Sequence, residues 1–353
     1  MSRPSPYLKT SYSADGALAG TAFLRTWLAV LAAAALAFPF VATPVLIDLA
    51  CRSAIAVVVA HALNLLTGYT GLVSLGHAGF IAAGAFASAV LAEELKAPFW
   101  VAVPSSILVG ALLGLVVGIP SLRLKGLYLA LSTLALHFVI LYAVGEYQSG
   151  RGFATGLLVP RPAVGPFTLS GAKAWYYVLL GIAVLTTLFC LNLVRTRPGR
   201  AWMAIRDRDI AAAAAGVNVT YYKLLAFVVS SALTAFCGSL WAYYNSFVSV
   251  EAFSFFMTIE YIAMIVIGGM GSILGSILGA LFVTMFPYAI DAAINALPGA
   301  ARLQTHLFAV KFGAFGLLMA LFLVLEPRGL VRIWSRLKTY FELWPFRYPP
   351  LRG

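Results

Sequence analysis

The chain has 353 residues, of which 62% are hydrophobic and only 10% are charged, and its 24 Lys and Arg outnumber its 12 Asp and Glu. So little polar material cannot cover the surface of a water-soluble globule of this size. Composition therefore excludes a soluble enzyme or a soluble binding domain and favours an integral membrane protein. The basic residues lie between apolar runs, so we interpret them as topology signals and expect no nucleic-acid partner.

Ten apolar runs follow one another along the chain, at about the length that a transmembrane helix needs. They cover roughly residues 27–46, 50–66, 74–92, 98–120, 127–145, 174–194, 224–246, 257–272, 273–296 and 307–325. None has the strict alternation of a membrane β-barrel, so we expect an all-α integral membrane protein with about ten transmembrane helices. A count of eight or nine stays open, because 74–92 and the pair 257–272 and 273–296 could be re-entrant.

The distribution of Lys and Arg predicts the orientation. If the N-terminus faces the cytoplasm and all ten runs cross, 17 of the 24 basic residues fall on the cytoplasmic side, six of them in 195–223 and six after residue 325. Cytoplasmic segments of membrane proteins are enriched in Lys and Arg, so both termini are expected in the cytoplasm. We expect a cytoplasmic tail over 1–26, a transmembrane domain over 27–325 with the cytoplasmic loop 195–223, and a basic tail over 326–353.

Motifs for chemistry on the chain itself are missing from the sequence. Cys51, Cys190 and Cys237 fall inside apolar runs without metal-ligand spacing, so we expect them to be buried packing residues. A Gly-Lys-Ser/Thr phosphate loop does not occur, so this chain is not expected to bind ATP by that device or to hold a cofactor. Without a Ser–His pair, paired carboxylates or metal spacing, we expect no catalytic residue, no metal site and no enzyme activity.

The hydrophilic segment 195–223 is the most informative part of the sequence. A helix from about Arg200 to Ala215 would place Trp202, Ile205 and Ile210 on or near one side, and Gly216 would end it in a left-handed conformation. A short amphipathic helix between two spans suits docking into a groove of a partner protein. A helix lying on anionic lipid headgroups is the alternative.

Two motifs stand out in this segment, Arg-Ala-x-x-Ala-Ile-Arg-Asp at 200–207 and Ala-Ala-x-x-x-Gly-Val-Asn at 211–218. With them the segment resembles the coupling segment of branched-chain amino-acid ABC transporter permeases, known as the "EAA" loop in binding-protein-dependent importers generally. Ile210 stands where other EAA loops have Glu, and acidic residues come slightly earlier. The resemblance implies that the residues coupling the chain to an ATPase are Arg200, Ala204, Arg206, Asp207, Asp209, Ala211, Ala212 and Gly216.

Further motifs extend the resemblance over about residues 50–332, and they are closest to the LivM-like type of permease. Residues 64–80 match the first Gly-rich signature of the family, 260–280 match the second, and Glu326-Pro-Arg-Gly-Leu330 resembles its terminal motif. The sequence departs from the family at Ser276, where Pro is frequent, and at Lys311 in the last span.

The Gly-rich segments are candidates for broken helices that line a translocation path. Glycine permits close packing and local unwinding, and unwound backbone in a membrane is tolerated where it is buried in protein or lines water. Simple helix packing is the alternative for each glycine, and hydrogen-bonded structure is the alternative for His77. Glu260, a carboxylate inside a predicted span, has either a substrate-contacting role or a solvated or gate-forming one. The path candidates are Gly68, Tyr69, Gly71, Ser74, Gly76, His77, Gly79, Phe80, Glu260, Gly268, Gly269 and Gly271.

The resemblance implies one half of a heterodimeric permease in the bacterial inner membrane, surrounded by lipid. Its implied partners are a second permease subunit, two cytoplasmic ATPases that bind ATP, and a periplasmic substrate-binding protein. The implied small-molecule substrate is a branched-chain or related amino acid, with urea, short amides and aromatic acids as alternatives. An ion-coupled secondary carrier would need buried ionisable residues, for which Glu260 alone is thin support, and would leave 195–223 unexplained.

Overall fold

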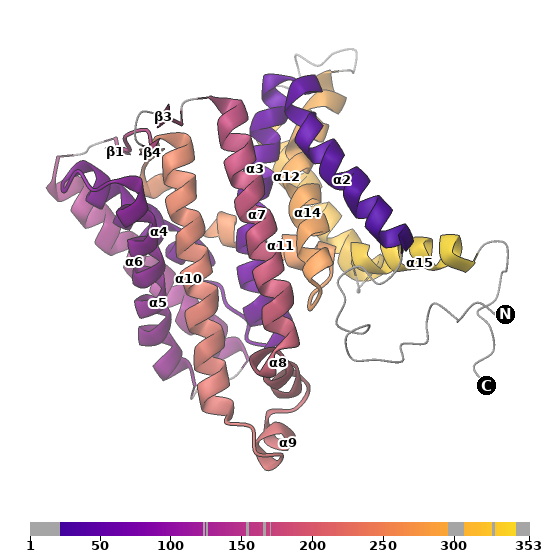
Figure 1. Ribbon diagram of the computed structural model, residues 1–353. Coiled ribbons are helices and arrows are strands. Elements are labelled where there is room, and N and C mark those ends of the chain that lie inside the picture. The colour runs from indigo at the N-terminus through magenta and orange to yellow at the C-terminus, as the bar shows by residue number, and fades with distance from the viewer. Residues whose placement is uncertain are drawn as a thin grey trace, which may run out of the picture.

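The computed structural model describes residues 22–122, 124, 126–152, 155–164, 167–169, 171–295, 307–326 and 329–343, and it is almost entirely helical (Figure 1). Residues 1–21 of the predicted N-terminal tail lie outside these residues, as do 327, 328 and 344–353 of the predicted C-terminal tail and both Arg123 and Lys125. The helices are α2 (Ala22–Val41), α3 (Pro44–Leu63), α4 (His77–Glu93), α5 (Phe99–Ser121), α6 (Leu127–Gly150), α7 (Ala172–Arg195), α8 (Arg197–Asp207), α9 (Asp209–Ala214), α10 (Val219–Asn245), α11 (Phe255–Gly268), α12 (Ile273–Asn295), α14 (Leu307–Leu325) and α15 (Leu330–Leu343). A π-helix (Asn64–Tyr69) continues α3, and a 3₁₀-helix (Val250–Ala252) precedes α11.

Length and hydropathy identify a multi-pass membrane protein. In the described part of the chain, 7 helical stretches are long and apolar enough to cross a membrane. Three shorter apolar helices, Arg25–Val41, His77–Glu93 and Lys311–Phe322, lie beside them. The short helices α8 and α9 project from one end of the bundle, which we call the α9 end (Figure 1).

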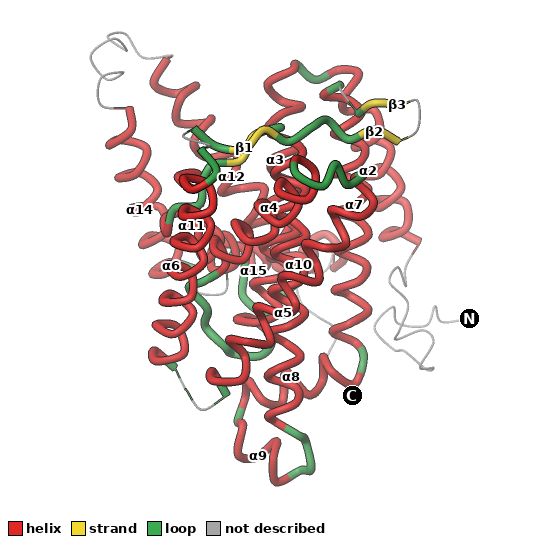
Figure 2. The backbone as a smooth tube through the Cα atoms, turned by 90° about the vertical axis from the view of Figure 1, so that its left-hand side faces the viewer, coloured by secondary structure: helices red, strands yellow, loops and turns green. Residues whose placement is uncertain are grey.

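Short antiparallel strands lie at the opposite end of the bundle, which we call the strand end. Figure 2 shows the strands in yellow at this end. β1 (Leu157–Leu158) pairs with β4 (Phe247–Val248), and β2 (Ala163–Val164) pairs with β3 (Phe167–Thr168). Sequence reasoning did not predict these pairs, because two-residue strands carry no periodicity.

The boundary between the first two helices lies earlier than predicted. α2 ends at Val41 and α3 begins at Pro44, whereas the apolar runs placed the boundary between residues 46 and 50. The Thr43 side chain accepts a hydrogen bond from the backbone N–H of Leu46, and proline suits the first turn of a helix because its missing N–H has no partner there. Asp48, which we expected in a connecting segment, and Arg52 consequently lie within α3.

Small residues bring the central helices α4, α5 and α10 together. A Cβ atom on Gly84 of α4 would collide with the backbone of Ala235 in α10, and one on Gly238 of α10 would collide with the backbone of Ile81 in α4. Gly110 and Gly114 of α5 pack in the same way on α10. In lipid, this close backbone approach replaces the hydrophobic effect as a source of helix association.

Gly84→Ala is expected to destabilise the folded chain by about 2 kcal/mol, because the added methyl group overpacks the α4–α10 crossing. Gly181→Ala in α7 is the matched control, since a Cβ there meets no atom within 4 Å. The thermal unfolding midpoint of the detergent-purified protein should fall for the first variant and not for the second. Equal midpoints would contradict the packing described for Gly84.

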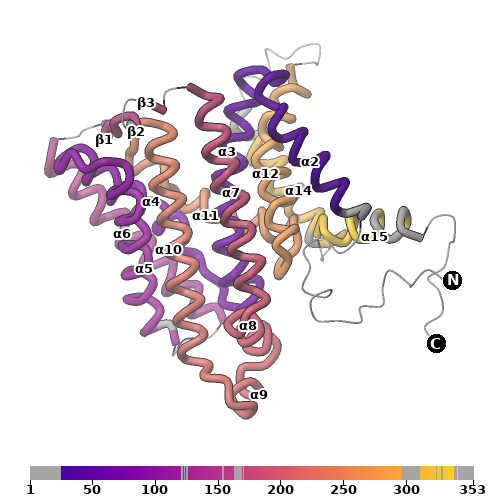
Figure 3. Tube along the Cα trace, in the orientation of Figure 1, coloured from indigo at the N-terminus to yellow at the C-terminus, as the bar shows by residue number. Residues whose placement is uncertain are grey.

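The last described helix, α15, runs crosswise to the bundle helices (Figure 3) and packs against α11 and α12. Gly329, directly before α15, has a left-handed backbone with φ 69°. A Cβ atom there would lie 2.6 Å from the backbone nitrogen of Gly269, so only glycine fits against the turn between α11 and α12. Part of the predicted C-terminal tail is therefore a packed element of the fold.

Candidate functional site

The two Gly-rich segments lie side by side, although they are about 200 residues apart in the chain. After the π-helix the chain is non-helical up to Gly76, and between Gly268 and Ile273 it turns from α11 into α12. Both interruptions leave backbone groups without helical partners, which in a membrane must be satisfied inside the protein.

Asn64 joins the two interruptions, and we call the place where they meet the Gly-rich junction. Its fully buried side chain donates from Nδ2 to the Ser272 carbonyl oxygen at 2.8 Å and to Ser276 Oγ at 2.7 Å. The backbone N–H of Gly271 donates to Asn64 Oδ1 at 2.8 Å. Sequence reasoning did not single out Asn64 as a site residue, because only its partners across the bundle distinguish it from any polar residue in a span.

Arg206 connects the same junction to α8. Its Nη1 donates to the carbonyl oxygen of Gly68 at 2.5 Å, and a Cβ atom on Gly271 would collide with its guanidinium group. Gly71 and Gly271 have φ values of 77° and 76°, a backbone conformation that favours glycine. One side chain of the hydrophilic segment thus touches both Gly-rich interruptions.

The predicted helix over 200–215 is in fact two helices. Arg208 is extended, with φ −158° and ψ 110°, between α8 and α9. Trp202 in α8 donates from Nε1 to the Tyr222 carbonyl oxygen at 2.8 Å, and Lys223 Nζ lies 3.5 Å from Asp209 in α9. α10 therefore holds each helix separately, and an acidic residue in the first turn favours a new helix start at Asp209.

The break at Arg208 changes which residues face outward. Trp202 and Ile205 are buried, whereas Ile210 is 78% exposed, so the prediction that these three share one side is wrong. Ala212, a predicted coupling residue, is buried within the chain, whereas Ala211 is exposed. Gly216, with φ 85°, confirms the predicted left-handed end of the segment.

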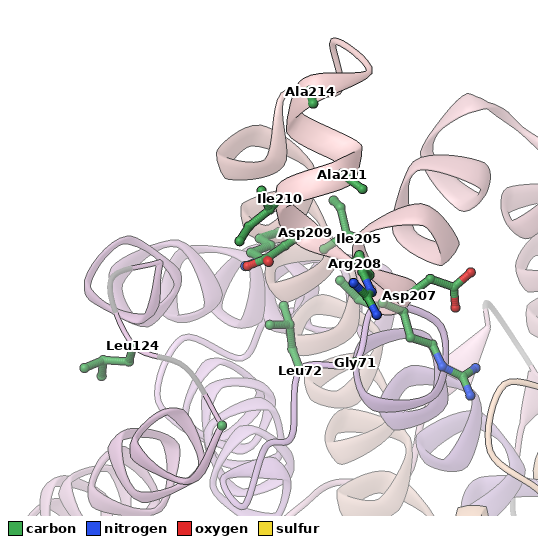
Figure 4. Close-up of a pocket in the computed structure, with 14 residues that line it drawn as sticks. Gly71, Leu72, Leu124, Ile205, Asp207, Arg208, Asp209, Ile210, Ala211 and Ala214 are labelled. Atoms are coloured by element: carbon green, nitrogen blue, oxygen red, sulfur yellow. The ribbon is translucent and has the colours of Figure 1, made fainter.

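The exposed side of this segment borders a hollow of about 600 Å³ at the α9 end (Figure 4). Its walls are the loop residues Gly71 and Leu72, the turn at Leu124 and Gly126, and both α8 and α9. Six of the predicted coupling residues are exposed, and four border the hollow. The exposed residues are Arg200, Ala204, Arg206, Asp207, Ala211 and Gly216, and the bordering ones are Arg206, Asp207, Asp209 and Ala211.

His77 belongs to a buried hydrogen-bond network. Its Nδ1 lies 3.2 Å from Ser74 Oγ and its Nε2 lies 3.0 Å from Ser230 Oγ, which itself donates to the Ala62 carbonyl oxygen at 2.7 Å. These bonds fasten the non-helical segment before α4 to α3 and α10, which supports the structural alternative for His77.

The neighbouring path candidates are also tightly packed. Gly76 and Gly79 lie against the backbone of Thr133 and His137 in α6, and Tyr69 and Phe80 are buried. Gly268 packs in the same way against Gly275 of α12. These contacts support the packing alternative for this part of the first Gly-rich segment and for Gly268.

Glu260 lies apart from the Gly-rich junction, toward the strand end. It borders a cavity of about 200 Å³ between α3, α10, α11 and α12, together with Arg52, Tyr244 and Thr284. A second hollow of about 360 Å³ lies beside it, at the strand end, and is bordered by Asp48, Arg52 and Tyr244 among others.

Sequence reasoning missed the other polar residues around Glu260. Arg52 and Tyr244 come from helices far apart in the chain, and the only signal was a charged residue close to the start of an apolar run. Asp291, a second carboxylate within a predicted run, was overlooked, and its Oδ1 lies 2.7 Å from Lys311 Nζ. Cys51, Cys190 and Cys237 are free and buried, as predicted.

The amino-acid sequence is similar to known transport proteins. Residues 45–324 match the family model for the branched-chain amino acid transport system permease component. The chain is 30% and 29% identical to the high-affinity branched-chain amino acid transport system permease proteins LivM of Salmonella typhimurium and Escherichia coli, over 87% of this chain and 75% of each relative. A probable branched-chain amino acid transport permease protein LivM of Methanocaldococcus jannaschii is 25% identical over 64% of this chain and 67% of the relative. No solved structure matches the chain.

Proposed function

Since this chain belongs to the family of branched-chain amino acid transport permease components, we propose that it is one half of the transmembrane domain of a binding-protein-dependent ABC importer. ATP-driven alternating access would carry branched-chain or related amino acids through the bacterial inner membrane. A second permease subunit, two cytoplasmic ATPases and a periplasmic binding protein would complete the importer. ATP would bind to the ATPases and not to this chain.

The proposal includes a topology with the α9 end in the cytoplasm and the strand end outside. The seven long helical stretches and the three shorter apolar helices would make ten crossings. The six basic residues of 195–223 support this orientation, because α8 and α9 project from one end of the bundle.

The observation that carries the proposal is the bond from Arg206 to the Gly68 carbonyl oxygen. It links α8, at the α9 end, to the point where the π-helix gives way to the non-helical segment, and through Asn64 to the turn between α11 and α12. A displacement of α8 by an ATPase would therefore act on both Gly-rich interruptions at once. An ion-coupled carrier has no ATPase that could displace α8, so it would not need a bond that transmits such a displacement.

The hollow beside α9 is the proposed docking surface for an ATPase. Ile210 is the large apolar residue that α9 exposes there, and truncating or charging such an anchor removes most of its binding contribution. Ile210→Asp is expected to lower copurification of the ATPases by about tenfold or more. Ala213→Asp adds the same charge at an exposed position of α9 that does not border the hollow, and it should leave assembly intact.

Uptake in proteoliposomes tests the proposed function. L-leucine should enter only when both ATPases, ATP and the binding protein are supplied, and the Ile210→Asp complex should lose this uptake. Equal assembly of the two α9 variants would refute the docking surface. Uptake driven by an ion gradient without ATPases would instead support the secondary carrier.

A further inference from the structure

The cavity that Glu260 borders, which we call the Glu260 cavity, carries charges of opposite sign on different helices. Glu260 belongs to α11, while Arg52 enters the same cavity from α3. Its volume of about 200 Å³ suits one small molecule. Ile55, Met264 and Val283 contribute an apolar wall, so the cavity combines charged and aliphatic surfaces.

The polar groups of this cavity have unused hydrogen-bonding capacity. In the described part of the chain, the Glu260 carboxylate forms no ion pair or hydrogen bond, and the buried Oγ1 of Thr284 has no partner. Arg52 donates from Nε to Asp48 Oδ2 at 2.8 Å, but its side chain remains 44% exposed, so further donors are available. Charges within a membrane are costly and mark functional sites that bind a partner or substrate.

Arg52 and Tyr244 separate the Glu260 cavity from the hollow at the strand end, because both residues border both spaces. Tyr244 donates to Asp48 Oδ1 at 2.5 Å, so the three side chains form one cluster between the two spaces. Arg52 is therefore available both to the hollow at the strand end and to the Glu260 cavity.

We propose that the Glu260 cavity is a transient binding site for the zwitterion of a free α-amino acid with an aliphatic side chain. Glu260 binds the α-ammonium group, Arg52 binds the α-carboxylate in competition with Asp48, and the apolar wall receives the side chain. A neutral molecule such as urea or a short amide would leave the Glu260 charge uncompensated, so the site discriminates against it. This inference rests on the proposed function and adds a substrate-recognition site to it.

Thiol protection tests the site independently of transport. Thr284→Cys is introduced into a chain whose three native cysteines are replaced by Ala, and the assembled complex is treated with a small methanethiosulfonate reagent. L-leucine should slow the modification several-fold. 3-Methylbutylamine lacks the carboxylate and 4-methylpentanoate lacks the ammonium group, so neither should protect at the same concentration.

Charge removal identifies the recognition groups. Glu260→Gln should abolish protection by L-leucine and raise the KM for uptake by about tenfold or more, because a charge-assisted hydrogen bond is lost. Arg52→Lys keeps the charge but loses the planar fork of donors, so it should raise the KM less. Glu251→Gln, at an exposed carboxylate that does not border the cavity, is the control and should change neither result.

The outcomes separate this inference from the proposed function. ATPase-dependent uptake of L-leucine without protection at position 284 overturns the binding site and leaves the importer standing. Protection by L-leucine in a complex without ATP-dependent uptake supports the site and contradicts the importer. Equal protection by the amine or the carboxylate, or a thiol that no reagent reaches in an assembled complex, also overturns the site.

Discussion

Asn64→Leu should destabilise the folded permease by on the order of 3 kcal/mol, because three partners of this buried side chain lose their hydrogen bonds at once. The Gly271 N–H, the Ser272 carbonyl and the Ser276 hydroxyl all bond to the Asn64 side chain. Water does not reach this fully buried position to replace it. The unfolding midpoint of the detergent-purified protein measures the loss.

Two further variants make the Asn64 result specific. Asn64→Asp keeps an acceptor for the Gly271 N–H and loses the donor to Ser272 and Ser276, so it should still destabilise the protein. Asn218→Ala removes an exposed helix cap, where the Asn218 side chain accepts from the Tyr221 N–H at 3.0 Å, and should cost about 1 kcal/mol. An Asn64→Leu effect no larger than that of Asn218→Ala would show that the junction does not depend on this side chain.

Arg206→Ala should uncouple ATP hydrolysis from uptake. The assembled importer is expected to keep its basal hydrolysis, while uptake per ATP falls at least about tenfold, because α8 no longer holds the Gly68 carbonyl oxygen. Arg206→Lys restores one donor without the planar fork and should recover part of the coupling. The measurement is the ratio of L-leucine uptake to phosphate release in proteoliposomes.

Arg197→Ala is the matched control for this experiment, because Arg197 is an exposed arginine on the same helix that neither borders the hollow beside α9 nor belongs to the predicted coupling residues. It removes the same charge and leaves the Gly68 bond in place. A similar loss of coupling in both variants would mean that the charge of the segment, and not the bond, transmits the movement.

Local signals account for the parts of the fold that the sequence predicted well. The turn between Gly268 and Ile273 and the left-handed end at Gly216 follow from glycine's own backbone freedom, which neighbouring residues do not alter. The length of each apolar run identified the long membrane-spanning helices, because this length is also a local property of the sequence. The boundary at Pro44 could also have been found, since Thr-Pro is a helix-start signal within the apolar runs.

Tertiary contacts account for the parts that failed. A continuous helix advances by 100° per residue, so one extended residue at Arg208 resets the phase of everything after it. Ile210 consequently turns outward while Trp202 and Ile205 stay buried, so the three residues do not share one side as predicted. The pairing of Arg206 with Gly68, and the meeting of Arg52 with Glu260, depend on how distant helices cross, and no local pattern encodes that.

The hydrogen bonds of Asn64 also determine the order in which the fold is completed while the chain is being synthesised. Asn64 and Gly271 are 207 positions apart, which corresponds to roughly 10–40 s of translation at about 5–20 residues per second. Throughout that interval the amide of Asn64 is already in the membrane while its partners do not yet exist. The hydrogen bonds between Asn64 and the turn after α11 therefore form among the last events of biogenesis. A nascent chain that stalls before residue 271 retains an unsatisfied polar side chain, which distinguishes it from the finished protein.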